Sequence, residues 1–221
     1  MKLLFQAIFK FILGVLMIML LLFLPAGTFN YWNAWLLMGL LFIPMFIAGI
    51  ILWIKNPDLL KKRLNVKEKE SEQKQVIGMS LIIFILGFII AGLDFRNGWS
   101  NMSITVIVIA YVIFVIAYIL YAEAMRENTY LSRTIEVQEN QKVIDTGLYG
   151  IVRHPMYFAT TILFLSFPIV LGSWISFAIF CFFPFVLVKR IKNEEVVLEN
   201  GLEGYKEYKQ KVKYKIITFL W

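Results

Sequence analysis

The chain has 221 residues, of which 60% are hydrophobic and only 17% are charged. A soluble domain of this size usually has about 45–50% apolar and about 25% charged residues, so the composition excludes an ordinary soluble protein. The net charge of +7 would suit a nucleic acid, but the basic residues lie between apolar runs, which favours a membrane surface. One cysteine, Cys181, and one histidine, His154, are too few for a disulfide or a Cys/His metal site. We expect neither a metal nor a nucleic-acid partner.

Four apolar runs in the first part of the chain predict transmembrane helices. They cover Leu3–Ala26, Tyr31–Ile54, Val76–Leu93 and Met102–Ala122. Each run is close to the ~20 residues that cross a bilayer core. The first run superficially resembles a signal peptide, but a second span follows it directly, so we interpret it as a helix that stays in the membrane.

A further apolar stretch, Met156–Val188, is too long for one span. Gly172-Ser173 interrupts it and predicts two short antiparallel helices. The sequence therefore predicts an all-α integral membrane protein, with four transmembrane helices followed by a C-terminal transmembrane helical hairpin.

The distribution of Lys and Arg predicts the orientation in the membrane. Segment Lys55–Lys74 is densely basic, which places it in the cytoplasm by the positive-inside rule. Counting spans from there puts both termini and the polar segment Glu123–Pro155 in the cytoplasm, and leaves only Arg96 outside. We expect a multi-pass membrane protein, in the cell membrane if the source is prokaryotic.

The polar segment Glu123–Pro155 is long for a connection between spans, which favours a functional loop. Alternation at Thr134–Val137 and at Lys142–Ile144 indicates two short strands around a turn. Beyond Gly204, the tail has aromatic and apolar residues at helical spacing, and we expect a helix that lies on the membrane or covers a site.

The densest group of functional residue types, Gly147–Tyr157, lies where this loop enters the membrane. Pro155 suits a first helical turn, so His154 would cap a helix N-terminus that favours an anion. Arg153 and His154 could equally be interfacial anchors of the helix.

A second group, Arg190–Glu195, ends the hairpin. Arg190 and Glu194 share one helix face, which allows a plain surface ion pair. The hairpin, however, returns this helix end to the side of His154, and ionisable groups at membrane depth are functional candidates. Spacing and composition alone predict a cytoplasm-facing site for a small polar ligand.

These motifs resemble the isoprenylcysteine carboxyl methyltransferase family, which is related to the membrane phospholipid N-methyltransferases. The matching residues are Gly147-Leu148-Tyr149, Arg153 to Tyr157, Arg190 with Glu194 to Leu198, and Tyr205 with Tyr208. The resemblance covers the C-terminal part of the chain, whereas the first four spans match only in general character. It implies one methyltransferase domain, residues 1–221, in which residues 1–122 form four spans and residues 123–221 form the catalytic part.

The resemblance also implies S-adenosyl-L-methionine as cofactor, in a cytoplasmic cap made by the loop, the hairpin and the tail. The implied cofactor-binding residues are Gln138, Gln141, Lys142, Val143, Ile144, Tyr149, His154, Pro155, Met156, Tyr157 and Glu194. Arg190 would face the methyl acceptor, and Arg153 and Glu195 are further catalytic candidates, Glu195 as the base if the acceptor is an amine.

We therefore expect a methyltransferase whose partners are the bilayer and a lipophilic acceptor. Carboxyl methylation of an isoprenylcysteine-like substrate is the first expectation, and N-methylation of a phospholipid of the phosphatidylethanolamine type is the alternative. Two other classes stay open. One is an NADPH-dependent membrane reductase with a similar cap. The other is a transporter or scaffold, which the lack of charges at mid-span disfavours.

Overall fold

The computed structural model describes residues 2–65, 71–132, 134–219 and 221, and these residues form helices and loops without a strand. Five helical segments are long and apolar enough to cross a membrane. They are α1 (Lys2–Ala26), α2 (Trp32–Lys55), α4 (Ser71–Asn97), α5 (Ile104–Glu127), and α7 (Trp174–Phe180) continued by α8 (Phe183–Gly201). The expected all-α integral membrane fold is confirmed.

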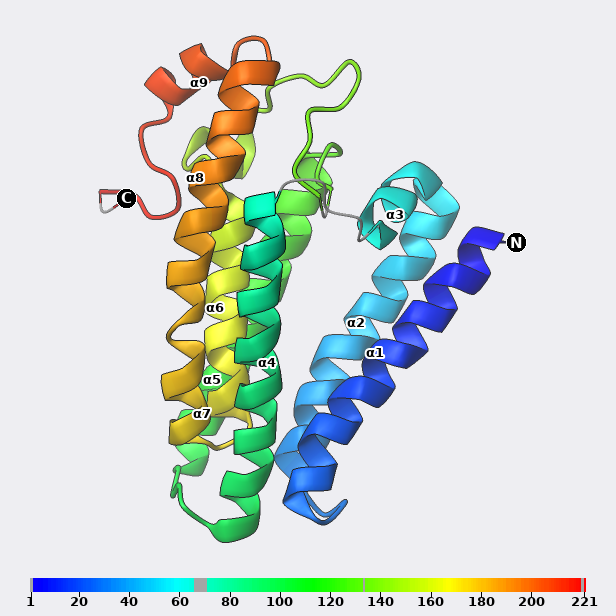
Figure 1. Ribbon diagram of the computed structural model, residues 1–221, viewed down its shortest axis with the longest axis vertical. Coiled ribbons are helices and arrows are strands. Elements are labelled where there is room, and N and C mark those ends of the chain that lie inside the picture. Colours follow the sequence, from blue (N-terminus) through cyan, green and yellow to red (C-terminus); the bar gives the residue numbers. More distant parts are fainter. Residues whose placement is uncertain (1, 66–70, 133, 220) are drawn as a thin grey trace.

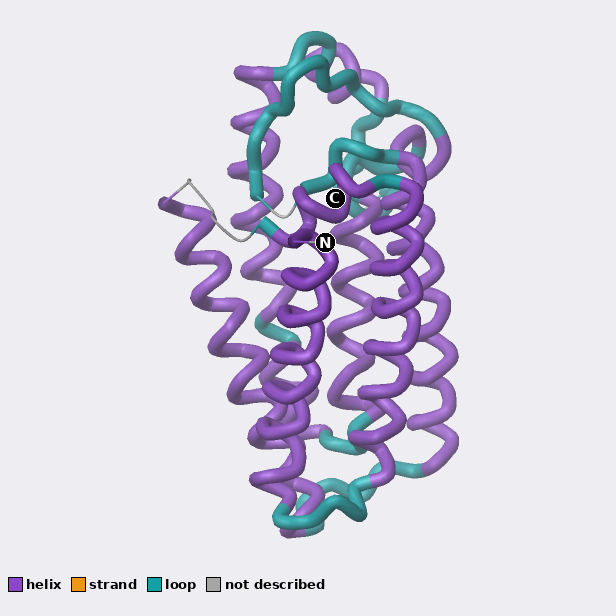
Figure 2. The backbone as a smooth tube through the Cα atoms, turned by 90° about the vertical axis from the view of Figure 1, so that its right-hand side faces the viewer, coloured by secondary structure: helices purple, strands orange, loops and turns teal. Residues whose placement is uncertain are grey.

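The helices form a bundle with an attached helix pair. Helices α4, α5, α7 and α8 surround α6 (Pro155–Val170), as Figure 1 and the turned view in Figure 2 show. The antiparallel pair α1 and α2 packs against the bundle at the lower end and leans away from it toward the upper end. Both termini, the loop after α5 and the short helices α3 (Pro57–Leu64) and α9 (Tyr205–Lys211) lie at the upper end.

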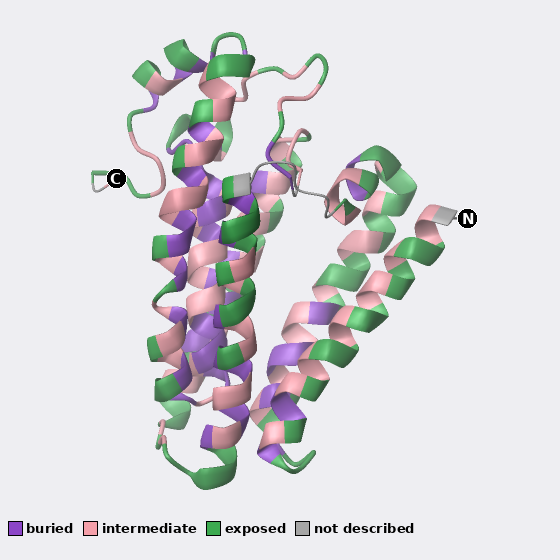
Figure 3. Ribbon diagram, in the orientation of Figure 1, coloured by how far each residue is buried: buried purple, intermediate pink, exposed green. Residues whose placement is uncertain are grey.

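Aromatic side chains fill the centre of the bundle. The rings of Phe84, Phe88, Phe167 and Phe180 contact one another, with centroids 5.3–6.3 Å apart, and Phe114 stacks on Phe167 at 5.6 Å. Buried residues concentrate in this bundle, and the outer helix faces expose large apolar side chains (Figure 3). In a bilayer such faces contact lipid.

The predicted hairpin is present. The chain turns at Gly172, whose φ of 80° is a left-handed conformation that suits glycine, and the Ser173 hydroxyl caps α7 by accepting from Ser176 N–H at 3.0 Å. Helix α6 has 16 residues and is about 24 Å long, shorter than a typical span. The other helices surround α6, so α6 can be shorter than a helix that faces lipid across the whole bilayer.

The second hairpin helix differs from the prediction, since it is interrupted at Cys181-Phe182 and resumes as α8. Pro184 explains the interruption, because proline has no N–H to donate to the carbonyl of Phe180. Its position in the first turn of α8 suits a helix start instead.

The two predicted strands are wrong. Residues 134–137 and 142–144 are loop and form no β-ladder with each other. Hydrogen bonds of the residues between them stabilise the loop instead. The backbone N–H of Gln138 donates to Gln141 Oε1 at 2.8 Å, and the turn is closed by Gln141 N–H donating to the Gln138 carbonyl at 3.1 Å. Asn140 has a φ of 57°, as a tight turn requires, so the turn itself was correctly predicted.

Candidate functional site

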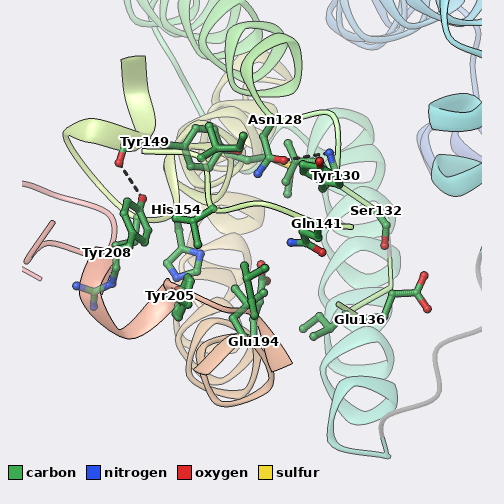
Figure 4. A pocket seen from close by; sticks show the side chains of 18 of the residues that line it. Asn128, Tyr130, Ser132, Glu136, Gln141, Tyr149, His154, Glu194, Tyr205 and Tyr208 are labelled. Carbon is green, nitrogen blue, oxygen red and sulfur yellow. Dashed lines mark hydrogen bonds between the residues drawn. The ribbon is translucent and has the colours of Figure 1, made fainter. Parts of the chain in front are cut away.

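A pocket lies at the upper end of the bundle, where α5, α6 and α8 meet the loop 128–146 and α9 (Figure 4). Its empty space is about 820 Å³, a figure that includes the part open to solvent. Eleven of the residues expected to form the site line this pocket. They are Gln141, Lys142, Val143, Ile144, Tyr149, Arg153, His154, Met156, Tyr157, Arg190 and Glu194.

The start of α6 fixes the floor of the pocket. Pro155 begins the helix and His154 is its N-cap residue, as the sequence predicted. The backbone N–H groups of Arg153 and His154 donate to the carbonyls of Tyr214 and Lys215, at 2.9 and 2.8 Å. The C-terminal tail therefore lies directly against the residues that precede α6.

Arg153 and Glu195 form a buried ionic network behind this floor. Arg153 Nε contacts Glu195 Oε1 at 2.7 Å, and His154 Nε2 lies 3.3 Å from the same oxygen. Arg153 Nη1 also donates to the carbonyls of Val212 and Lys213, at 2.7 and 2.8 Å. Lys215 Nζ is 3.1 Å from Glu195 Oε2. The carboxylate is 3% exposed and surrounded by cations, so it is paired in the way a buried charge requires.

This network ties the tail to α6 and α8, and Glu195 is outside the pocket lining. Arg153 lines the pocket, yet its printed hydrogen bonds go to Glu195 and to the tail. Both residues are placed to position other groups, and the geometry gives no support to Glu195 as a base.

A second chain of contacts connects α6 and α8 at the pocket. The Tyr157 hydroxyl donates to Glu194 Oε2 and accepts from Arg190 Nε at 2.8 Å. The Arg190 guanidinium also lies over the Tyr157 ring, 5.8 Å from its centroid, and donates from Nη1 to Gln73 Oε1 at 3.3 Å. Tyr157 thus joins a carboxylate and a guanidinium that both line the pocket.

Tyrosines of α9 close the pocket on the side of the tail. The Tyr208 hydroxyl donates to the carbonyl of Tyr149 at 2.8 Å. The Tyr205 side chain is 4% exposed, and within the described residues its hydroxyl has no hydrogen-bond partner. Burial raises the pKa of both hydroxyls, and for Tyr205 the carboxylates of Glu195 and Glu194 raise it further. Both therefore remain protonated donors near neutral pH.

Two other expected residues, Gln138 and Pro155, are outside the lining. The Gln138 side chain donates to the Tyr130 carbonyl and accepts from Lys62 Nζ, both at 2.5 Å. It therefore shapes the loop and connects it to α3. Pro155 acts through the backbone, by starting α6.

Sequence reasoning missed several residues of this region. Gln73 is 1% exposed and holds Arg190 because α4 begins at Ser71, before the apolar run. A polar residue three positions before the buried Val76, on the same helix face, was the signal for it. Tyr130, Ser132 and Glu136 also line the pocket, but they lie on irregular loop for which no periodicity exists.

The lining suits a small zwitterion with an aromatic part. Tyrosine rings provide stacking and cation–π surfaces, Glu194 provides a carboxylate, and the buried Tyr205 hydroxyl is a donor that the described residues leave unsatisfied. An S-adenosylmethionine-like cofactor fits this set of donors and acceptors. Among the described residues, no group of three or more His, Cys, Asp or Glu side chains is arranged to hold a metal ion.

A family model described as phospholipid methyltransferase matches residues 105–203. The match covers slightly less than half of the chain, from α5 through α8, and includes most of the pocket. It supports the broader class of membrane methyltransferases and does not single out the isoprenylcysteine carboxyl methyltransferases within it. The comparison with curated proteins gave no match.

Proposed function

We propose that this protein is an S-adenosylmethionine-dependent methyltransferase that acts on a lipophilic acceptor at the membrane. The similarity to phospholipid methyltransferases over residues 105–203 supports the class of reaction. The observation that carries the proposal is the pocket itself. It is lined by a carboxylate and several tyrosines, among them Tyr205, whose buried hydroxyl has no hydrogen-bond partner within the described residues, and it lies at one end of a bundle of apolar helices.

Glu194 and the tyrosines would hold the cofactor. The Glu194 carboxylate is oriented by the Tyr157 hydroxyl and suits the amino group of the methionine part. The Tyr205 hydroxyl would donate to the ligand, and the rings of Tyr149 and Tyr157 suit a sulfonium. When bound, the cofactor supplies the methyl group, which passes to the acceptor as the bond from methyl carbon to sulfur breaks.

Arg190 would orient the acceptor. Its guanidinium is fixed by Tyr157 and Gln73 and lines the pocket. A carboxylate acceptor is ionised at neutral pH and needs no base, so positioning is the main contribution of the protein. An amine acceptor must also lose a proton, and the geometry does not support Glu195 as the base, because Arg153 and Lys215 hold it outside the pocket lining.

We also propose that the pocket and both termini face the cytoplasm, where the cofactor is made. The basic helix α3 lies at the same end as the pocket, as Figure 1 shows, and the positive-inside rule places such a segment in the cytoplasm.

A transfer assay tests the proposal. Membranes that contain the protein are supplied with S-adenosylmethionine labelled in the methyl group, and with either a farnesylated cysteine derivative or phosphatidylethanolamine. We expect label in one of these lipids, which identifies the acceptor class. Glu194→Gln should lower the rate about tenfold or more, since a hydrogen bond to a charged group is lost.

Glu203→Gln is the matched control, because Glu203 is exposed in the turn that follows α8. It should keep the full rate. Equal rates for wild type and Glu194→Gln would contradict the role of Glu194, and incorporation no greater than in membranes without the protein would contradict the proposed activity with these acceptors.

A further inference from the structure

Arg63 lies on the short helix α3, beside the pocket but outside its lining. Its guanidinium is half-buried and contacts three residues of two other helices. Nη2 contacts the Tyr121 hydroxyl and lies 3.1 Å from Met125 Sδ, while Nη1 lies 3.9 Å from Met156 Sδ. The guanidinium carbon is 5.5 Å from the centroid of the Tyr121 ring.

The side chains that Arg63 contacts are uncharged. Within the described part of the chain, its hydrogen-bond partners are one hydroxyl and two thioethers, and none of them is a carboxylate. Thioethers are weak acceptors, whereas a guanidinium offers five N–H donors. A partly buried cation without an anion costs free energy, and an anionic ligand would remove that cost.

Arg63 lies shortly after the end of α2, a helix long and apolar enough to cross a membrane. Helix α2 ends at Lys55, and α3 follows it directly from Pro57. Leu59 and Leu60 of α3 are buried against the rest of the protein, which fixes the helix beside the end of α2, and Lys61 is exposed. Figure 1 shows α3 on the side of the molecule where α1 and α2 lean away from the bundle.

Met156 connects this site to the pocket. Its sulfur contacts Arg63, its side chain lines the pocket, and the next residue, Tyr157, holds Glu194 and Arg190. The Met156 side chain therefore lies between a group bound at Arg63 and the pocket that Glu194 and Arg190 line.

From these contacts we infer that Arg63 and Tyr121 form a subsite for an anionic oxygen group, a phosphate or a carboxylate, on the lipophilic acceptor. This inference rests on the proposed function, because it names a recognition element of the same substrate. The planar guanidinium matches the two oxygens of either group in a bidentate manner, and the Tyr121 hydroxyl supplies one more polar contact.

Binding of simple amphiphiles tests the subsite without transfer. Dodecyl phosphate and dodecanoate are titrated, below their micelle-forming concentrations, into the whole 221-residue chain in dodecyl maltoside micelles, a detergent without phosphate or carboxylate, with dodecanol and inorganic phosphate as reference ligands. We expect at least one of the two anionic amphiphiles to bind more tightly than dodecanol and inorganic phosphate, and the stronger one shows whether the subsite prefers phosphate or carboxylate.

Arg63→Gln should weaken that binding about tenfold or more, as expected for a lost charged hydrogen bond. The matched control is Lys61→Gln, which removes the same charge from the exposed side of the same helix and should change binding less than about twofold. Arg63→Lys keeps the charge and should give an intermediate loss, because the bidentate geometry is gone.

Two results would overturn the subsite. One is equal weakening by Arg63→Gln and Lys61→Gln, which indicates general surface attraction, and the other is no preference of the wild type for either anionic amphiphile over dodecanol. S-adenosylhomocysteine is titrated into each variant as well. Retained binding shows that Arg63→Gln is folded, whereas a wild type that binds the amphiphile but no S-adenosylhomocysteine would contradict the proposed function and leave the subsite standing.

Discussion

At the scale of single residues, Tyr157 connects the two charged groups of the hairpin helices that line the pocket. Its hydroxyl donates to Glu194 and accepts from Arg190, so one hydroxyl helps to hold both charged side chains in position. A preorganised arrangement of this kind favours catalysis, because the charges need not rearrange when substrates bind.

Tyr157→Phe should therefore lower methyl transfer about tenfold or more while the fold persists, since only the hydroxyl is removed. Initial rates on purified protein check this. Tyr118→Phe is the matched control, because the Tyr118 hydroxyl donates to the Leu41 carbonyl away from the pocket, and it should leave the rate unchanged. A Tyr157→Phe enzyme as fast as the wild type would show that the ring, and not the hydroxyl, matters.

The two tyrosines of α9 offer a second comparison at this scale. Tyr208→Phe removes a hydrogen bond to the Tyr149 carbonyl and should cost about 1 kcal/mol of stability. Tyr205→Phe removes a hydroxyl for which the described residues provide no partner, so it should cost little stability but weaken S-adenosylhomocysteine binding. Thermal melting with and without S-adenosylhomocysteine separates the two effects. Equal loss of stability in both variants, with no effect on binding, would show that Tyr205 only packs.

At the scale of elements, a buried ionic network attaches the C-terminal tail to the bundle, together with the backbone hydrogen bonds from Arg153 and His154 to Tyr214 and Lys215. Arg153 donates to Glu195 of α8 and to the carbonyls of Val212 and Lys213, so a single side chain connects α8, α6 and the tail. Helix α9 precedes these carbonyls and brings Tyr205 and Tyr208 over the pocket. The position of the pocket wall thus depends on Arg153.

Arg153→Gln should release the tail and leave a buried carboxylate without its closest cation, at a cost of about 3–5 kcal/mol. Hydrogen exchange measured by mass spectrometry should become faster in residues 205–218, while exchange in α4 and α5 stays slow. Lys206→Gln, at an exposed position of α9, is the control and should exchange as the wild type does. Unchanged protection of the tail in Arg153→Gln would contradict the tethering role.

At the scale of the whole molecule, the bundle has one polar end with the pocket and one end of short turns. The proposed orientation places the pocket in the cytoplasm. In a Cys181→Ser background, a cysteine at Lys206 should react with a membrane-impermeant thiol reagent only after the cells are permeabilised. A cysteine at Thr28, exposed in the turn after α1, should react in intact cells. The reverse pattern would invert the topology.

Much of this architecture could be predicted from the sequence, because membrane spans depend on local composition. Apolar runs placed the long helices, Gly172-Ser173 placed the hairpin turn, and Pro155 placed the start of α6. The motif residues that line the pocket were also identified, since the hairpin returns α8 to the start of α6.

What escaped prediction depends on contacts between distant segments. The contact of Gln73 with Arg190 requires the packing of α4 against α8, and the subsite at Arg63 requires α3 to lie beside α5. A polar residue on the buried face of α4 marks Gln73 as a candidate, but the partner of neither Gln73 nor Arg63 follows from a local pattern. The break before α8 is different, because Pro184 is a local signal: its missing N–H cannot continue α7.

The central claim, a methyl-donor pocket at the end of the bundle, is tested most directly by calorimetry of ligand binding to the detergent-solubilised protein. S-adenosylhomocysteine and NADPH are titrated in parallel into wild type, Glu194→Gln and Glu203→Gln. Our account predicts about micromolar affinity for S-adenosylhomocysteine in wild type and Glu203→Gln, a loss of about tenfold or more in Glu194→Gln, and no binding of NADPH. Binding of NADPH in place of S-adenosylhomocysteine would contradict the account and indicate a reductase.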